Sequence, residues 1–217
     1  MELDQNEYIV QRPMQFAFNV VYQGLDSKGN TVFAAKQHML GGNLDLLDAS
    51  GKAIGSLHTK FSLKPQYELF DGNSTRIGRA VKTSHIISLN SKYQLEDASG
   101  AIVAVATGEI MGYNYTITDQ NGYSSLATIS KISPFNAANA SGSQGFGGLL
   151  REFVAITMNA SKLTILDQSF NKLLIVEFTI AIDHIANHHS GNVPFSAGGV
   201  SNQGFGGIGI GGGGINL

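Results

Sequence analysis

Hydrophobic and polar residues alternate in short runs through much of the first 130 residues, and most runs end at an aspartate. In "YQLEDASGAIVAVATG", Tyr93 and Leu95 alternate with polar residues before Asp97, and small and β-branched residues follow Gly100. Since successive side chains of a strand point to opposite faces, this period of two is typical of a half-buried strand. The stretch therefore predicts a β-hairpin with a D-x-x-G turn.

The same motif occurs at least five times. Its copies begin at Tyr22, Leu44, Tyr67, Tyr93 and Tyr115, and their aspartates are Asp26, Asp48, Asp71, Asp97 and Asp119. Aspartate accepts hydrogen bonds from the backbone N–H groups of a turn, and glycine can adopt a positive φ, so we interpret these residues as turn residues rather than metal ligands. The third copy, "DGNS", has its glycine at Gly72, which leaves its turn type open.

A sixth pair of strands is expected further along. "LLREFVAITMN" can form one strand, "ASK" a turn and "LTIL" a return strand that ends at Asp167, which brings the number of strands to twelve. Residues 133–148 contain Pro, Asn, Ser and Gly without periodicity and are expected to form a long loop.

An apolar segment follows and is predicted to form a helix over residues 168–189, with Asp167 or Ser169 as its N-cap. Residues 173–182 are apolar on nearly every side apart from Glu177, so the helix must be buried all round. The run is about half the roughly 20 residues that span a bilayer, which favours burial inside the protein. Glu177 is then expected to have an inward Arg or Tyr as its partner.

The five hairpins in series and "LTILDQSFNKLLIVEFTIAIDHI" together resemble the LURP-one-related family, relatives of the phospholipid scramblases and of Tubby C-terminal domains. The resemblance spans residues 16–189. It implies a mainly β fold, a twelve-stranded closed β-barrel of six hairpins around a buried C-terminal α-helix. Residues 1–15 would form an N-terminal segment and residues 190–217 a Gly-rich tail.

The resemblance also implies a class of function. Tubby domains bind phosphoinositides and scramblase relatives are associated with lipid movement, so we expect a non-enzymatic binding or scaffold protein with phospholipid headgroups as the candidate ligand. One alternative is a scramblase-like lipid-transfer protein, and another is an enzyme with a site in the barrel mouth. "DQSFNKLLIVEF" has no Glu at its twelfth position, which argues against the calcium-binding loop of scramblases.

The net charge and the distribution of basic residues limit the classes of partner that the chain can bind. The net charge of −2 gives no field that would recruit nucleic acid. The candidate site for an anionic headgroup is the densest basic stretch, which contains Lys60, Lys64, Arg76, Arg79 and Lys82. Strand alternation places Arg76 and Lys82 on one face and Arg79 on the other, which favours a solvated face over one shared phosphate site.

Little other chemistry is indicated. The chain has no cysteine, which excludes disulfides and thiolate metal sites, and it contains no common nucleophile motif. Residues 204–209, "GFGGIG", formally match the dinucleotide pattern G-x-G-x-x-G, but no strand is expected before them and only more glycine follows, so no catalytic residue and no cofactor are expected. His184 and His188 lie one helical turn apart and form a weak alternative metal site, although solvated histidines are the plainer interpretation.

The ends of the chain suggest location and partners. The N-terminus lacks a basic region followed by an apolar run, so we expect a cytoplasmic protein, with a peripheral position at the membrane as an option. "QGFGG" begins at Gln144 and again at Gln203, which we interpret as coincidence in glycine-rich sequence. The alternative is that both segments serve for self-association or for contact with a membrane surface, and the Gly-rich tail is also a candidate for contacts with protein partners.

Overall fold

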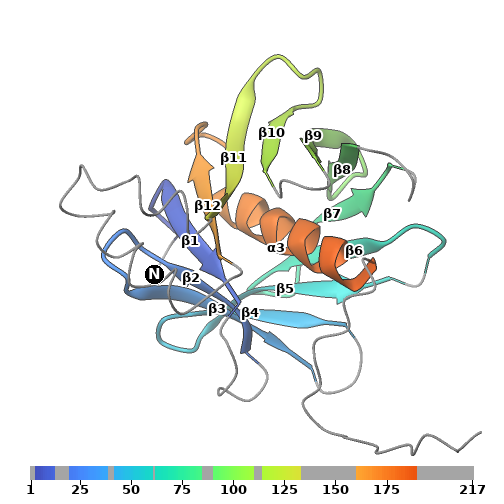
Figure 1. Ribbon diagram of the computed structural model, residues 1–217. Coiled ribbons are helices and arrows are strands. Elements are labelled where there is room, and N and C mark those ends of the chain that lie inside the picture. The colour runs from blue at the N-terminus through green and yellow to red at the C-terminus, as the bar shows by residue number, and fades with distance from the viewer. Residues whose placement is uncertain are drawn as a thin grey trace, which may run out of the picture.

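The alternating segments form strands, and each D-x-x-G motif connects two of them. The computed structural model describes residues 3–12, 20–38, 42–60, 62–84, 90–109, 114–132 and 160–189. Its elements are β1 (Glu7–Gln11), β2 (Val20–Leu25), β3 (Thr31–Gln37), β4 (Leu44–Asp48), β5 (Ala53–Thr59), β6 (Gln66–Asp71), β7 (Arg76–Lys82), β8 (Asn90–Asp97), β9 (Ile102–Glu109), β10 (Tyr115–Asp119), β11 (Ser125–Ile132), β12 (Ala160–Ile165) and α3 (Lys172–His189). The twelve strands form one closed antiparallel barrel around α3, as the sequence predicts (Figure 1).

Five neighbouring pairs, from β2–β3 to β10–β11, are the predicted hairpins. The prediction for the sixth pair is wrong. The "ASK" residues expected to form a turn lie inside β12, and β12 pairs with β11 on one side and with β1 on the other. The strand expected over residues 149–159 lies outside the described residues. Since β1 also pairs with β2, the strand Glu7–Gln11 from the N-terminal segment closes the barrel.

The motif aspartates form the turns as predicted. In the fourth hairpin, Asp97 Oδ1 accepts hydrogen bonds from the backbone N–H groups of Ser99 at 2.8 Å and Ala101 at 3.0 Å. The Ser99 hydroxyl donates to the same oxygen, and these bonds to the charged form hold the pKa of Asp97 below its usual value. All five turns lie at the same end of the barrel, where α3 begins. We call it the turn end.

The third turn has the same geometry in spite of its altered sequence. Ser74 lies three residues after Asp71, where the other four turns have a glycine, and it adopts the same left-handed conformation with φ 61°. Its N–H donates to Asp71 O at 2.9 Å, as the glycine does in the other turns. Gly72 is needed for a different reason, because a Cβ there would lie 2.8 Å from the carbonyl oxygen of Ala53.

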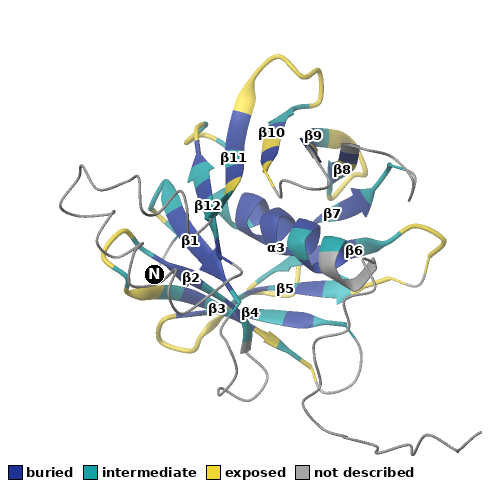
Figure 2. Cartoon of the chain, viewed as in Figure 1, coloured by how far each residue is buried: buried dark blue, intermediate teal, exposed yellow. Residues whose placement is uncertain are grey.

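The core lies between α3 and the inward side chains of the strands. The tyrosines and leucine that begin the motifs point inward, and Leu44 and Tyr93 are fully buried. Their counterparts on the returning strands are small, and Ala80, Ala104 and Ala106 are also fully buried. Figure 2 shows the resulting pattern, with the inner strand faces and most of α3 buried. The helix contacts β5, β6, β7 and β12.

The helix begins later than predicted. Asn171, rather than Asp167 or Ser169, is the N-cap, because its Oδ1 accepts a hydrogen bond from Leu174 N at 3.2 Å and its carbonyl oxygen accepts one from Ile175 N. Asp167 Oδ1 instead accepts from Ser169 N at 2.9 Å in a separate turn. The prediction failed because both aspartate and asparagine are favoured as caps, and the sequence offered Asp167 first.

Candidate functional sites on and inside the barrel

The predicted basic residues occupy two regions rather than one. On the outer face of β5–β7, Glu68 Oε1 lies 3.1 Å from Lys60 Nζ and 3.8 Å from Arg76 Nε. Arg79 pairs with Glu96 on β8 through both its Nε, at 2.9 Å, and its Nη2. Three of the five cations are therefore already engaged with carboxylates on the outer surface.

The expected division of this strand between two faces is partly wrong. Pairing between β6 and β7 shifts register between Leu69 and Phe70, because Phe70 lies opposite Arg76 while Leu69 lies opposite Gly78. This bulge gives β7 an extra residue, so Arg76 lies on the outer face with Arg79. A sequence gives strand alternation but not the position of a bulge, and a bulge reverses the facing of every residue beyond it.

Lys64 and Lys82 lie at the other end of the barrel, which we call the loop end. Lys64 is exposed in the loop between β5 and β6, next to Leu63, whose side chain is also fully exposed. Lys82 is the last residue of β7, and its N–H donates to Pro65 O at 3.0 Å. This bond brings the end of β7 against the loop. We refer to residues 62–65 as the Leu63 loop.

Inside the barrel, Glu177 is completely buried, as the apolar helix predicts, but the expected arginine or tyrosine partner is not there. Among the described residues, neither carboxyl oxygen has a partner in hydrogen-bond geometry. The carboxyl lies against β5, where a Cβ on Gly55 would be 2.2 Å from Glu177 Oε1. Burial raises the pKa of Glu177 well above its usual value, and the charge of Asp71 adds to the rise. The backbone N–H of Ser56 faces the carboxyl and opposes this rise, although it lies outside hydrogen-bond geometry.

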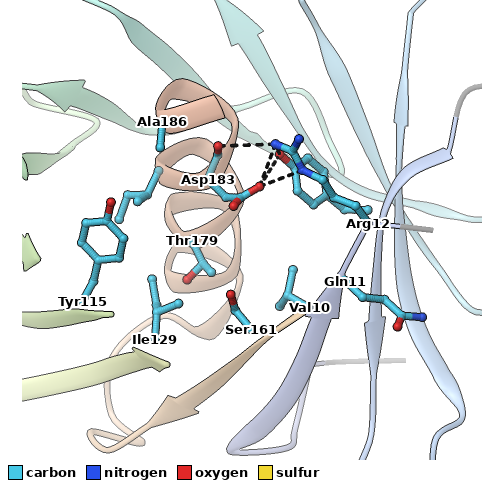
Figure 3. Close-up of a pocket in the computed structure, with 11 residues that line it drawn as sticks. Val10, Gln11, Arg12, Tyr115, Ile129, Ser161, Thr179, Asp183 and Ala186 are labelled. Atoms are coloured by element: carbon cyan, nitrogen blue, oxygen red, sulfur yellow. Dashed lines mark hydrogen bonds and ion pairs between the residues drawn. The ribbon is translucent and has the colours of Figure 1, made fainter. Parts of the chain in front are cut away.

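A polar cluster attaches the last half of α3 to the barrel wall. Figure 3 shows Arg12, which follows β1, reaching Asp183 on the helix. Arg12 Nη2 lies 2.8 Å from Asp183 Oδ2 and donates to Tyr22 Oη at 2.7 Å, while Tyr22 Oη donates to Asp183 Oδ2 at 2.8 Å. The adjoining cavity of about 30 Å³, bordered by Ser161 and Thr179, has room for about one water molecule. Because the cavity is too small for a larger ligand, we interpret the cluster as structural: it attaches α3 to the barrel wall.

His184 is buried rather than solvated, which corrects the plainer interpretation of the helix-end histidines. Its Nδ1 lies 2.5 Å from Tyr67 Oη, and its ring packs edge-on against the Tyr67 ring. Burial raises the pKa of Tyr67 to about 12, so the tyrosine is neutral. The side chain of His188 lies outside the described residues. Within the described ranges, no group of three His, Asp or Glu side chains could hold a metal ion.

At the turn end, a groove of about 560 Å³ lies between the N-terminal segment, the β4–β5 and β6–β7 turns and the start of α3. Leu3, Lys52, Ile54, Asn73 and Leu173 are among its lining residues. This groove has no sequence signal, because it is built from four segments that meet only when the barrel closes. The loop 133–148, the "QGFGG" segments and the tail lie outside the described residues, and their roles stay predictions.

Comparisons with known proteins agree with this architecture. The sequence model of the LURP-one-related family matches residues 8–145. Among solved structures, the X-ray structure of a protein from Arabidopsis thaliana is similar with a TM-score of 0.53 and 13% identity, covering 82% of this chain and 89% of that one. At that identity the likeness shows the fold alone. No curated protein matches.

Proposed function

Because this chain belongs to the LURP-one-related family, we propose that it is a non-enzymatic binding protein that contacts anionic phospholipid headgroups through its Leu63 loop. The observation that carries the proposal is the pairing of a fully exposed leucine with a neighbouring lysine at the tip of this loop. Moving a leucine side chain from water at a loop tip into the interfacial region of a bilayer lowers the free energy. A lysine beside it can contact lipid phosphates at the same depth.

The charges around the loop support the same ligand. Lys60 directly follows β5 and Lys82 is the last residue of β7, so two further cations lie in the segments next to the loop that holds Leu63 and Lys64. Lys60 is half exposed and pairs with Glu68, a contact that a headgroup phosphate can replace. Each lysine near an anionic membrane surface contributes about 1 kcal/mol, so three lysines and one leucine support weak, reversible binding.

This proposal leaves the helix inside the barrel, unlike the scramblase-like alternative. If α3 left the barrel, the Arg12–Asp183 ion pair would break and the carboxyl of Glu177 would enter lipid, which costs free energy. In the described part of the chain, no helix has the length and apolarity that crossing a membrane requires. Contact through the Leu63 loop needs no such rearrangement.

Flotation with vesicles tests the proposal. The vesicles are phosphatidylcholine alone, phosphatidylcholine with phosphatidylserine, and phosphatidylcholine with a bisphosphorylated phosphoinositide. We expect the full chain to float with the two anionic compositions, and Leu63→Ser and Lys64→Gln each to lower the bound fraction about fivefold, which corresponds to about 1 kcal/mol.

Two matched controls lie at the turn end. Tyr123→Ser removes another exposed large apolar side chain, and Lys28→Gln removes another exposed cation. Both controls should float like the wild type. Equal loss in the loop variants and the controls, or no flotation with any vesicle, would reject the proposal.

A further inference from the structure

The groove at the turn end has the size of a ligand site and lies far from the Leu63 loop. Its volume of about 560 Å³ falls within the range of small-molecule pockets. Its walls come from the N-terminal segment, two hairpin turns and the helix start, so the folded barrel holds them together. Any function of this groove is independent of the headgroup contact proposed above.

Hydrogen-bond capacity around the groove is dominated by donors. Two acceptors on its wall are already used within the protein, since Asp48 Oδ1 accepts from the backbone of Ser50 and Lys52, and Asn171 Oδ1 accepts from Leu174 N. The remaining side-chain donors are the ammonium groups of Lys52 and Lys172 and the amide NH₂ groups of Asn73 and Asn171, against two side-chain acceptors, Asp48 Oδ2 and Asn73 Oδ1. With two ammonium groups against the one carboxylate of Asp48, and more free donors than acceptors, the lining favours an anionic ligand that accepts hydrogen bonds.

Lys172 is positioned for this role. Its Nζ donates to the carbonyl oxygen of Asp4 at 2.6 Å, which fixes the ammonium at the groove wall. An ammonium has three donors, so two remain for a ligand. Lys52, on the turn between β4 and β5, is exposed, and its ammonium group donates no hydrogen bond to a described residue.

The rest of the lining is apolar. Leu3, Ile54 and Leu173 are half-buried, and each leaves part of its side chain at the groove. A purely ionic ligand would leave this surface in water, whereas a ligand with a short hydrocarbon portion would cover it.

We propose that this groove binds a small organic anion, a carboxylate or phosphate monoester that carries a short apolar chain. The anionic group lies between Lys52 and Lys172 and accepts from the amide of Asn73. The apolar chain packs on Ile54 and Leu173.

Octyl phosphate is a suitable probe, with inorganic phosphate and octanol as the two halves of its chemistry. Titration of the full chain is followed through the backbone amide NMR signals of Lys52, Ile54, Asn73 and Leu173. We expect these four signals to shift with octyl phosphate, and inorganic phosphate and octanol to bind at least tenfold more weakly. Lys52→Gln and Asn73→Asp should weaken binding at least about fivefold, and Lys28→Gln, on the neighbouring hairpin turn, should not.

Competition with vesicles then identifies the source of the anion. If vesicles containing phosphatidic acid displace octyl phosphate, the groove accepts a lipid headgroup, and if they do not, it accepts a free metabolite; both results support the site. Octyl phosphate that leaves the four signals in place would overturn it. Equal affinity in the wild type, Lys52→Gln and Asn73→Asp, or octanol binding as tightly as octyl phosphate, would also overturn it.

Discussion

Glu177 fits inside the barrel because Gly55 has no side chain. A Cβ at residue 55 would lie 2.2 Å from Glu177 Oε1 and 3.0 Å from the carbonyl oxygen of Phe70. The strand and the helix therefore share one small space, which the glycine leaves to the carboxyl. Gly55 and Glu177 are 122 positions apart in the sequence, yet each determines what the other can be.

Replacing either residue should reveal this coupling. We expect Gly55→Ala to destabilise the protein by about 2 kcal/mol in the wild-type background, and by clearly less when Glu177 is alanine, because the shorter side chain makes room. The measurement is a double-mutant cycle of urea unfolding. A coupling energy below about 0.5 kcal/mol would show that the two side chains do not compete for space.

The raised pKa of Glu177 predicts that stability falls with rising pH. An unfolded glutamate loses its proton near pH 4.5, while the buried one keeps it to a much higher pH, so the unfolded state binds fewer protons in between. Stability from this group is full below about pH 4.5 and is lost as the pH rises toward the folded pKa, with a slope of up to about 1.4 kcal/mol per pH unit.

Glu177→Gln should remove this dependence, since the amide has nearly the same shape and does not ionise. We expect its melting temperature to exceed that of the wild type at pH 8, and Glu177→Ala to melt below Glu177→Gln because it leaves a cavity. Parallel pH profiles of melting temperature for the wild type and Glu177→Gln would contradict the buried neutral acid.

Ser74 adopts a backbone conformation that glycine adopts more readily. We expect Ser74→Gly to stabilise the protein by roughly 0.5–1 kcal/mol, and the reverse change at the equivalent position, Gly100→Ser, to destabilise it by a similar amount. Urea unfolding of both variants provides the measurement. If Ser74→Gly were less stable than the wild type, the left-handed geometry assigned to Ser74 would be wrong.

The polar cluster on α3 should make a measurable contribution to stability. Tyr22→Phe removes a hydroxyl that donates to Asp183 and accepts from Arg12, so we expect a loss of about 1.5 kcal/mol. Tyr8→Phe is a matched control, because the Tyr8 hydroxyl is buried without a partner in hydrogen-bond geometry among the described residues, although the backbone of Gln5 approaches it. Equal losses of stability for Tyr22→Phe and Tyr8→Phe would show that the cluster does not stabilise the protein.

The hairpins could be predicted from sequence because their determinants are local. An aspartate such as Asp97 forms its turn with residues two and four positions ahead, and the alternation before it marks the inward face. The sixth pair failed because its determinants are not local. The strand Glu7–Gln11 is short and its partner Ala160–Ile165 begins with Ala, Ser and Lys, a sequence typical of a turn, so only barrel closure identifies the two as neighbours.

The candidate sites were predictable only in part. Composition identified the basic residues, but a bulge in β7 placed Arg76 on the outer face with Arg79. Lys64 and Lys82 instead lie at the loop end, which the order of the strands determines. The burial of Glu177 followed from the apolar helix, whereas its neighbour Gly55 did not, because a glycine in a strand carries no sign of what fills the space beside it. The groove at the turn end depends on four distant segments and has no sequence signal.

The most direct test of the proposed function asks whether the Leu63 loop enters the bilayer. The chain has no cysteine, so Leu63→Cys and Tyr123→Cys each provide a single attachment point for an environment-sensitive fluorophore. On addition of vesicles containing an anionic lipid, we predict a blue shift and quenching by lipid-attached quenchers for the label at residue 63, and no change for the label at residue 123. Vesicle binding with an unshifted label at residue 63 would contradict contact through this loop.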